Sequence, residues 1–168
     1  MNIRDELQST TQALVQKGKG ILAADESAPT IAKRFQAIGV ESTEDNRLAY
    51  RSLILATPGL SEFISGVILF EETLAQSADE DVMIPELCTQ KDIVPGIKVD
   101  KGKLALPNAP GDEITQGLDG LELRLKGYKQ QGARFAKWRD VYHITETTPS
   151  SLAIRANAEV LARYAAIC

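Results

Sequence analysis

The apolar residues of the chain recur at two spacings, one typical of α-helices and one typical of β-strands. Helical spacing predicts a first helix that begins near Ile3 and stops at Gly18, and a second that stops at Gly39. Ser42, followed three places later by Asp45, resembles a capping box and predicts the start of a third helix. Two more helices are expected, in residues 118–132 and 150–167.

Strand-like stretches alternate with these helices. They are GILAAD (20–25), FISGVILFEE (63–72), IVPGIKVDKG (93–102) and ARFAKWRDVYHI (133–144). The stretch KLALPNAPGDEITQ (103–116) is expected to be a loop. The alternating order predicts an α/β fold with a parallel sheet covered by helices.

Every expected strand ends in charged residues, and the carboxyl ends of parallel strands carry the functional groups in such folds. The charged residues are Asp25 and Glu26, Glu71 and Glu72, Lys98 and Asp100, and Lys137 and Arg139. One charged strand end is what any loop boundary gives, but four in succession favour a polar site at one end of the sheet.

Two lysines stand inside strand-like sequence. Lys98 lies between Ile97 and Val99, and Lys137 lies in a similar apolar setting. Because side chains alternate faces along a strand, Lys98 shares a face with Asp100, and Lys137 shares one with Phe135 and Arg139. In a barrel these side chains would point into the mouth.

Burying an unpaired ammonium is costly, so each lysine requires a carboxylate or an anionic ligand. Asp25 and Asp100, with Glu71 or Glu72, are the candidate partners. Several cations in one mouth fit a phosphorylated or carboxylated substrate. The alternative is structural: the lysines form internal ion pairs or lie on a solvated edge strand. The sequence alone does not decide between a substrate-binding role and this structural role.

Ser27 and Thr30 follow the first strand, at the start of the helix that carries Pro29. A hydroxyl there caps the helix, and a helix N-terminus is also an anion site. Both roles are compatible with the sequence.

Composition narrows the class of protein. The chain has 168 residues, 43% of them hydrophobic and 25% charged, which suits one globular domain. A net charge of −4 argues against a nucleic-acid partner, and no apolar run reaches the roughly 18 residues of a membrane helix. The N-terminus lacks the apolar core of a signal peptide.

The cysteines and the histidine give no sign of a metal site or a disulfide framework. Cys88 and Cys168 are far apart, as expected for a reducing cytosol, so a cytoplasmic location is predicted. His143 is the one histidine, and no zinc cluster surrounds it. His143 is expected to be a strand-end residue. A catalytic Ser-His-Asp arrangement that includes His143 is the alternative, although no neighbouring residue suggests one.

Several motifs carry a resemblance to a known family. KGILAADES, TIAKRF, ISGVILFEETL, IVPGIKVDKG, TQGLDGL, GARFAKWR and LARYAAI closely resemble the class I (Schiff-base) fructose-1,6-bisphosphate aldolases, and most closely the bacterial and plastid-type branch. The resemblance implies a (β/α)8 TIM barrel that reversibly cleaves fructose 1,6-bisphosphate to dihydroxyacetone phosphate and glyceraldehyde 3-phosphate. It implies an imine mechanism, with no metal and no other cofactor.

The resemblance also assigns roles to residues. Asp25 matches the aspartate that assists proton transfer at the C4 hydroxyl, and Lys137 the lysine that stabilises charge during carbon–carbon cleavage. Arg139 matches a basic residue that lines the same pocket. The group that holds the 6-phosphate corresponds to Ser27, Thr30 and Lys98. Lys33 and Arg34 match a basic pair on the following helix, expected on a solvated helix face, with a position near the phosphate as the alternative. The sequence SAPT at 27–30 departs from the Thr-Gly of many relatives, with little expected effect because proline is tolerated in a first helical turn.

The sequence holds about four strand–helix units, and the imine-forming lysine of the family lies on a later strand. Residues 1–168 are therefore expected to be the N-terminal half of a single aldolase-type TIM-barrel domain, with strands one and four as open edges. The chain alone is expected to be catalytically weak or inactive. Its partners are expected to be a sugar-phosphate substrate and copies of itself, as in the family's tetramer, with no nucleic acid and no membrane. The alternative is a non-catalytic sugar-phosphate-binding or self-assembling half-barrel.

Overall fold

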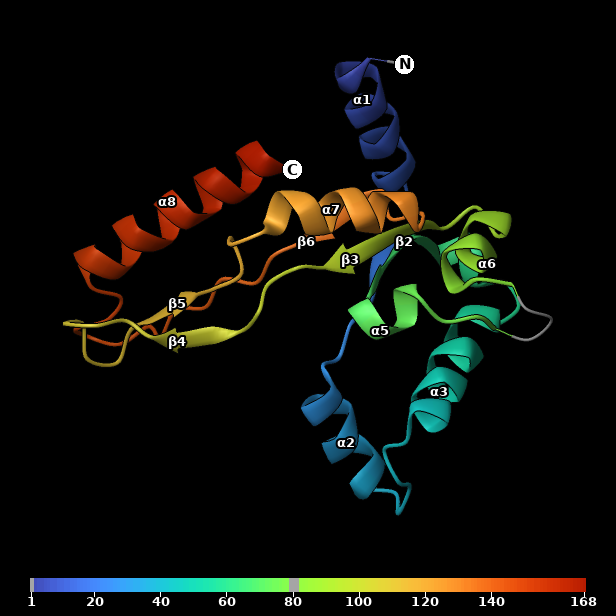
Figure 1. Cartoon of the computed structure of the whole chain (residues 1–168), viewed down its shortest axis with the longest axis horizontal. Helices are drawn as coiled ribbons and strands as arrows, with labels where there is room; N and C mark the ends of the chain where they lie inside the picture. Colours follow the sequence, from blue (N-terminus) through green and yellow to red (C-terminus); the bar gives the residue numbers. More distant parts are fainter. Residues whose placement is uncertain (1, 79–81) are drawn as a thin grey trace. The chain divides into compact units, whose positions relative to one another are not determined.

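Figure 1 shows the computed structural model of the chain, which describes residues 2–78 and 82–168. The described residues form two compact units. The first comprises the described residues of Met1–Lys98 and the segment Tyr128–Ala136, and the second comprises Val99–Gly127 and Lys137–Cys168.

The first unit is built on a four-stranded sheet with the order β1-β2-β3-β6. Its strands are β1 (Gly20–Ala24), β2 (Ile64–Leu69), β3 (Val94–Lys98) and β6 (Phe135–Lys137), of which the last residue, Lys137, belongs to the second unit. β2 pairs in parallel with both β1 and β3, as the alternating sequence pattern predicts. Just before β6, the amide of Arg134 donates to the carbonyl of Pro95 at 2.8 Å. Within the described sheet β1 and β6 are the edges, as expected for strands one and four.

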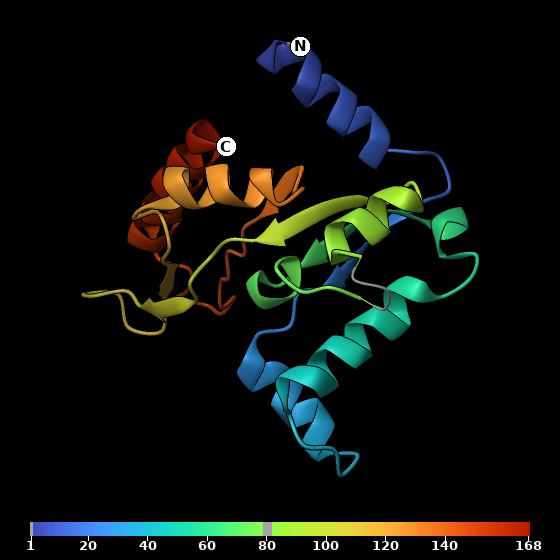
Figure 2. The same cartoon turned by 45° about the vertical axis from the view of Figure 1, so that its right-hand side comes forward.

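Helices precede, connect and follow these strands (Figure 1, Figure 2). They are α1 (Ile3–Leu14), α2 (Ala28–Gln36), α3 (Glu44–Ala56), α4 (Leu60–Phe63), α5 (Glu71–Leu74), α6 (Ile84–Gln90) and α7 (Leu121–Gln130). α2 and α3 lie side by side, with Phe35 and Tyr50 in an edge-to-face contact whose ring centroids are 5.7 Å apart. Among residues 2–78 and 82–168, no helix combines the length and apolar character needed to cross a membrane.

The core of the first unit lies on the face of the sheet that Val67, Leu69 and Ile97 cover, and these side chains are almost fully buried. Apolar residues of the helices are buried with them: Ile31, Phe35, Leu55, Leu74, Ile84 and Cys88. Burial raises the pKa of the Cys88 thiol to about 12. This thiol is therefore almost entirely protonated at neutral pH and acts as an apolar side chain.

The third helix begins one residue later than the sequence predicts. Thr43, not Ser42, is the N-cap residue, because its hydroxyl accepts a hydrogen bond from the amide of Asn46 at 3.2 Å. The carbonyl of Ser42 instead accepts a hydrogen bond from Arg47 at 2.6 Å. Ser42 and Thr43 are adjacent hydroxyl residues, and either type is a favoured N-cap, so the acidic residue three places after Ser42 was not decisive.

The second unit contains an antiparallel pair where the sequence predicts a loop. β4 (Lys103–Ala105) pairs with β5 (Glu113–Thr115), so the loop prediction for 103–116 is wrong. The chain reverses between these strands with Asn108 at a φ of 60° and Gly111 at 86°. Proline-rich turn chemistry masked the short strands on either side.

The second unit also contains α8 (Ser151–Ile167). The hydroxyl of Ser150 caps this helix by accepting from the amide of Ala153 at 3.2 Å. Asn157, which is fully buried, donates to the carbonyl of Glu113 at 3.0 Å and so fastens α8 to β5.

The fourth strand is much shorter than expected, because β6 ends at Lys137. Beyond it, the carbonyl of Arg139 accepts a hydrogen bond from the Thr115 hydroxyl at 2.8 Å, and the Asp140 carboxylate accepts from the amide of Val141 at 3.2 Å. The backbone here makes these bonds to side chains and is not part of a strand. The predictions that Arg139 shares a strand face with Lys137 and that His143 is a strand-end residue are therefore wrong; His143 is exposed in irregular structure.

The ring of Phe135 lies against the face of the sheet opposite the core face, where Leu14 at the end of α1 also contacts β2. The side chain of Phe135 lies over Gly66 of β2 and Gly96 of β3. A Cβ atom added at Gly96 would lie 2.3 Å from Cζ of Phe135, whereas one at Gly66 would lie 2.5 Å from Cδ2 of Leu14 and 3.4 Å from Cε1 of Phe135. Residue 96 must therefore be glycine if the Phe135 ring is to keep this position.

We expect Gly96→Ala to lower the free energy of unfolding by about 1–3 kcal/mol, because the ring must be displaced from a packed position. Urea unfolding followed by circular dichroism measures the change. Gly20→Ala is the matched control: a Cβ there meets nothing within 4 Å, so its effect should stay within about 0.5 kcal/mol. Equal effects of the two substitutions would contradict the packing of Phe135 on β3.

Candidate functional site

The register of the sheet aligns the ends of its first three strands. Ala24 is paired with Leu69, and Leu69 with Ile97. Asp25 and Lys98 each come one residue after this aligned row, at the same end of the sheet and two strands apart. Adjacent strands are about 4.8 Å apart, which puts the two backbones on the order of 10 Å from each other.

The side chains of Ile97, Lys98 and Val99 alternate between the two faces of the sheet, as the sequence predicts. Lys98 is the last residue of β3 and is half-buried, while its neighbours Ile97 and Val99 are each 1% exposed. Those two side chains belong to the core face. Lys98 therefore lies on the opposite face, the one that Phe135 covers at Gly96.

The hydroxyls of Ser27 and Thr30 are brought together at the start of α2. Ser27 is the N-cap residue, with Pro29 in the first turn, and its carbonyl accepts from the amides of Thr30 at 2.9 Å and Ile31 at 3.0 Å. The two hydroxyl oxygens are 3.0 Å apart and hydrogen-bonded to each other. Both are open to solvent, so an anion can reach them at the N-terminus of a nine-residue helix.

The carboxylate of Glu72 does not serve as a lysine partner. It accepts from Nε and Nη2 of Arg47 at 2.8 and 2.5 Å, and from Nη1 of Arg51 at 3.2 Å. The hydrogen bonds from Arg47 are the main reason that the pKa of Glu72 is lowered. The adjacent carboxylate, Glu71, accepts from the hydroxyl of Tyr128 at 2.5 Å.

The basic pair on α2 divides between solvent and protein. Lys33 is exposed, as expected for a solvated helix face. Arg34 instead forms an ion pair with Glu26, and this carboxylate raises the pKa of Arg34. Arg34 therefore fastens α2 to the residue between Asp25 and Ser27.

Two of the residues matched to the family's site, Lys137 and Arg139, belong to the second unit. The carbonyl of Lys137 accepts from the amide of Val99 at 3.1 Å. Arg139 is exposed, and its carbonyl is fixed by Thr115. Asp25, Ser27, Thr30 and Lys98 belong to the first unit. Across residues 2–78 and 82–168, no cluster of His, Cys, Asp and Glu side chains is arranged to hold a metal ion.

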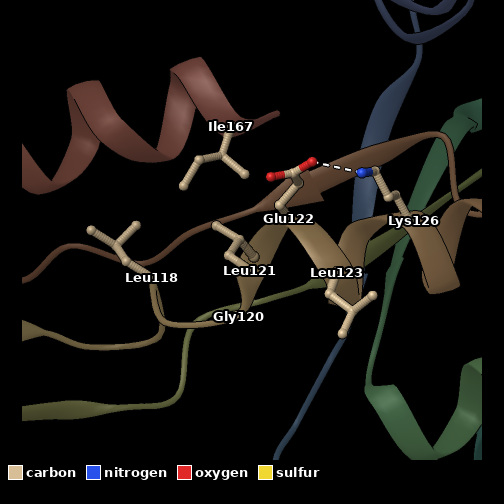
Figure 3. A pocket seen from close by; sticks show the side chains of 7 residues that line it. All are labelled: Leu118, Gly120, Leu121, Glu122, Leu123, Lys126 and Ile167. Atoms are coloured by element: carbon tan, nitrogen blue, oxygen red, sulfur yellow. Dashed lines mark hydrogen bonds and ion pairs between the residues drawn. The ribbon is translucent and has the colours of Figure 1, made fainter.

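The second unit also has an open hollow of about 510 Å³, shown in Figure 3. Its lining residues come from the start of α7, the turn before it and the end of α8: Leu118, Gly120, Leu121, Glu122, Leu123, Lys126 and Ile167. The two charged side chains of the lining, Glu122 and Lys126, pair with each other at 2.6 Å. None of the six residues matched to the family's site lines it, and its polar groups do not converge on a common point.

The arginines around Glu72 were not anticipated from the sequence. Arg51 is fully buried and reaches both Glu72 and the carbonyl of Glu26, which accepts from Nη2 at 2.8 Å. The available signal was the spacing of Arg47 and Arg51, four residues apart on one helix, ahead of a carboxylate at a strand end.

Comparison with known proteins places this arrangement in a family. The family model described as "Glycolytic: Fructose-bisphosphate aldolase class-I" matches residues 6–168. This chain belongs to the class-I fructose-bisphosphate aldolase family. It is 54% identical over 164 residues to a probable fructose-bisphosphate aldolase class 1 of Xylella fastidiosa, covering 98% of this chain and 49% of that protein. It is 55% identical over 167 residues to a fructose-bisphosphate aldolase of Drosophila melanogaster, covering 99% and 46%.

A solved structure of fructose-bisphosphate aldolase from Plasmodium falciparum, in complex with TRAP and a small-molecule inhibitor, has the same fold. The TM-score is 0.94 at 53% sequence identity, over 98% of this chain and 48% of that one. The predicted fold class, a (β/α)8-barrel family member with about the first four strand–helix units, is thereby confirmed. The chain spans about half the length of the curated relatives it matches.

The lowered pKa of Glu72 makes its contribution to stability dependent on pH. The pKa of Glu72 in the folded chain lies below its pKa in the unfolded chain, which is near 4.5. The ionised carboxylate therefore stabilises the fold at pH values above 4.5, and this stabilisation is lost as the pH falls through the folded-state pKa. We expect Glu72→Gln to be destabilising at pH 7, with a difference from wild type that shrinks below about pH 4.5. Urea unfolding at a series of pH values measures it.

The control for this series is Glu122→Gln. The pKa of Glu122 is also lowered, through Lys126, but both side chains of that pair are largely exposed. Its substitution should leave stability close to that of wild type at every pH. A destabilisation by Glu72→Gln that stayed constant down to the lowest pH at which both proteins fold would contradict the ion-pair explanation.

Proposed function

We propose that this chain supplies one part of a fructose-1,6-bisphosphate aldolase site, the part that holds a substrate phosphate and assists proton transfer. In the family's reaction, fructose 1,6-bisphosphate is cleaved reversibly to dihydroxyacetone phosphate and glyceraldehyde 3-phosphate. The observation that carries the proposal is the aligned row of strand ends, which brings Asp25 and Lys98 to one end of the sheet beside the Ser27–Thr30 hydroxyl pair.

The phosphate-binding role falls to Ser27, Thr30 and Lys98. Two hydroxyls at a helix N-terminus donate to phosphate oxygens, and the dipole of α2 favours a negative charge there. Lys98 contributes a point charge at the same end of the sheet.

The catalytic roles are assigned to Asp25 and Lys137. Asp25 exchanges a proton with the C4 hydroxyl as the carbon–carbon bond breaks, and Lys137 stabilises the charge that develops. Arg139 is proposed to supply an additional cation to the substrate. The amine that forms the imine with the substrate carbonyl is proposed to come from a lysine outside these 168 residues.

The wider setting follows from the same proposal. The 168 residues form the N-terminal half of one TIM-barrel domain and act in the cytoplasm, where sugar phosphates are the substrates. The complete protein assembles as a homo-oligomer, with the tetramer as the expected form, and uses neither nucleic acid nor a membrane.

The first test is made on the 168-residue chain alone. We expect no cleavage of fructose 1,6-bisphosphate above the level of a Lys137→Ala control, because the imine-forming amine is absent. Intact-mass spectrometry after borohydride reduction with dihydroxyacetone phosphate should find no stable adduct. An adduct that disappears in Lys98→Ala or Lys137→Ala would show that a lysine of this chain forms the imine, and would overturn that part of the proposal.

The second test places the chain in a complete barrel. A chimera in which these residues replace the matching half of the Xylella fastidiosa relative should cleave fructose 1,6-bisphosphate. Asp25→Asn in the chimera should lower kcat by at least about 100-fold while the borohydride adduct still forms, since the imine lysine is intact. A folded chimera that forms the adduct but whose kcat does not respond to Asp25→Asn or Lys137→Met would contradict the assigned roles. Glu122→Gln, outside the proposed site, is the control.

A further inference from the structure

Arg51 is a buried cation that links two strand ends of the first unit. Its side chain has no exposed surface, and it extends from α3 to the carbonyl of Glu26, which it reaches at 2.8 Å, and to the carboxylate of Glu72 at 3.2 Å. Glu26 comes two residues after β1, and Glu72 three residues after β2. The guanidinium also lies 5.5 Å from the centroid of the Phe70 ring.

A guanidinium in this position requires a specific compensation. Taking it out of water costs several kcal/mol unless its charge and its N–H groups are matched. Glu72 supplies the charge and is itself fixed by two hydrogen bonds from Arg47, at 2.8 and 2.5 Å. The Glu26 carbonyl is the second acceptor. One terminal nitrogen of Arg51, Nη1, therefore binds Glu72, and the other, Nη2, donates to the backbone after β1.

The carbonyl that Arg51 holds lies between two residues of the proposed site. It belongs to the peptide that joins Glu26 to Ser27, and Asp25 immediately precedes it. On the other side, the carbonyl of Ser27 is held by the amides of Thr30 and Ile31. The segment that carries Asp25 and the Ser27 hydroxyl is therefore fixed from α3 at one peptide and from α2 at the next.

We propose that Arg51 is a positioning residue that sets the placement of Asp25 and Ser27 through the Glu26 carbonyl. It touches neither substrate nor reacting atoms on this account. The inference deepens the proposed function, because it explains what fixes the loop that carries the proton-transfer carboxylate and one phosphate-binding hydroxyl.

Arg47 provides a matched control in the same helix, one turn away. Both arginines bind Glu72, so either substitution removes a guanidinium from that carboxylate. Arg47 makes its remaining contacts with Ser42, whereas Arg51 makes its backbone contact with Glu26. A general loss of the ion-pair network would affect both variants, and a positioning role would affect Arg51→Met alone.

The experiment compares the wild-type chain with Arg51→Met, Arg51→Lys and Arg47→Met by two measurements. The first is amide hydrogen exchange at Thr30 and Ile31 by NMR, with the amides of β2 as the internal reference. We expect exchange to be at least about tenfold faster at these two amides in Arg51→Met, since a charged donor to the Glu26 carbonyl is lost. Arg47→Met should leave them within about twofold of wild type.

The second measurement is titration with inorganic phosphate, followed at the Ser27 and Thr30 resonances. We expect Kd to rise about tenfold in Arg51→Met and to be intermediate in Arg51→Lys, because a lysine keeps the charge but not the fork. Absence of phosphate binding by the wild type would contradict the proposed function, and the exchange rates would still decide the role of Arg51.

The positioning role is overturned if Arg51→Met folds with wild-type exchange at Thr30 and Ile31, or if Arg47→Met accelerates exchange there equally. If Arg51→Met does not fold, Arg51→Lys decides. If the Thr30 and Ile31 amides of Arg51→Lys then exchange as slowly as in the wild type, the guanidinium is not required to bind both Glu72 and the Glu26 carbonyl. Faster exchange in Arg51→Lys that is confined to these two amides would support the positioning role.

Discussion

The parallel register of β1, β2 and β3 is the constraint on which the rest of the first unit depends. Pairing of Ala24, Leu69 and Ile97 in one row fixes which side chains enter the core and which lie on the other face. A slip by one residue would turn Lys98 into the helical layer and Ile97 out of it. Burial of apolar side chains on one face therefore decides the position of the charged residues that follow, without any direct interaction between the two groups.

The ion pairs around Glu72 fix the loops that follow the aligned strand ends. Around Glu72 two guanidiniums share one carboxylate, and the geometry is asymmetric: Arg47 binds it with two nitrogens, and Arg51 with one. That asymmetry leaves the second arm of Arg51 available to the backbone of Glu26. A carboxylate at a strand end thus acts through an arginine on the neighbouring strand end, which couples two loops that are distant in the sequence.

The sequence was sufficient for the strands and long helices because their apolar spacing matches the environment in which they fold. It located β1, β2 and β3 and the alternation at Lys98. It missed the β4–β5 pair, since three-residue strands beside prolines carry too few alternating positions to be recognised. It extended β6 too far because Trp138 and Val141 favour strands, whereas contacts with Thr115 and the Asp140 side chain divert the backbone. It offered Glu72 as one candidate partner for the lysines, because the sequence of charged residues does not show which cation lies nearest to a carboxylate in space.

The ring of Phe135 resting on two glycines has a consequence for how this family can change over time. The space above Gly96 is filled by a side chain from a strand that comes much later in the chain, and the space above Gly66 is shared by that side chain and Leu14. A larger residue at 96 is acceptable when a smaller one replaces the phenylalanine, and each change is harmful without the other. Positions 96 and 135 should therefore evolve as a compensating pair, and a chain assembled from two different relatives must take both positions from the same parent.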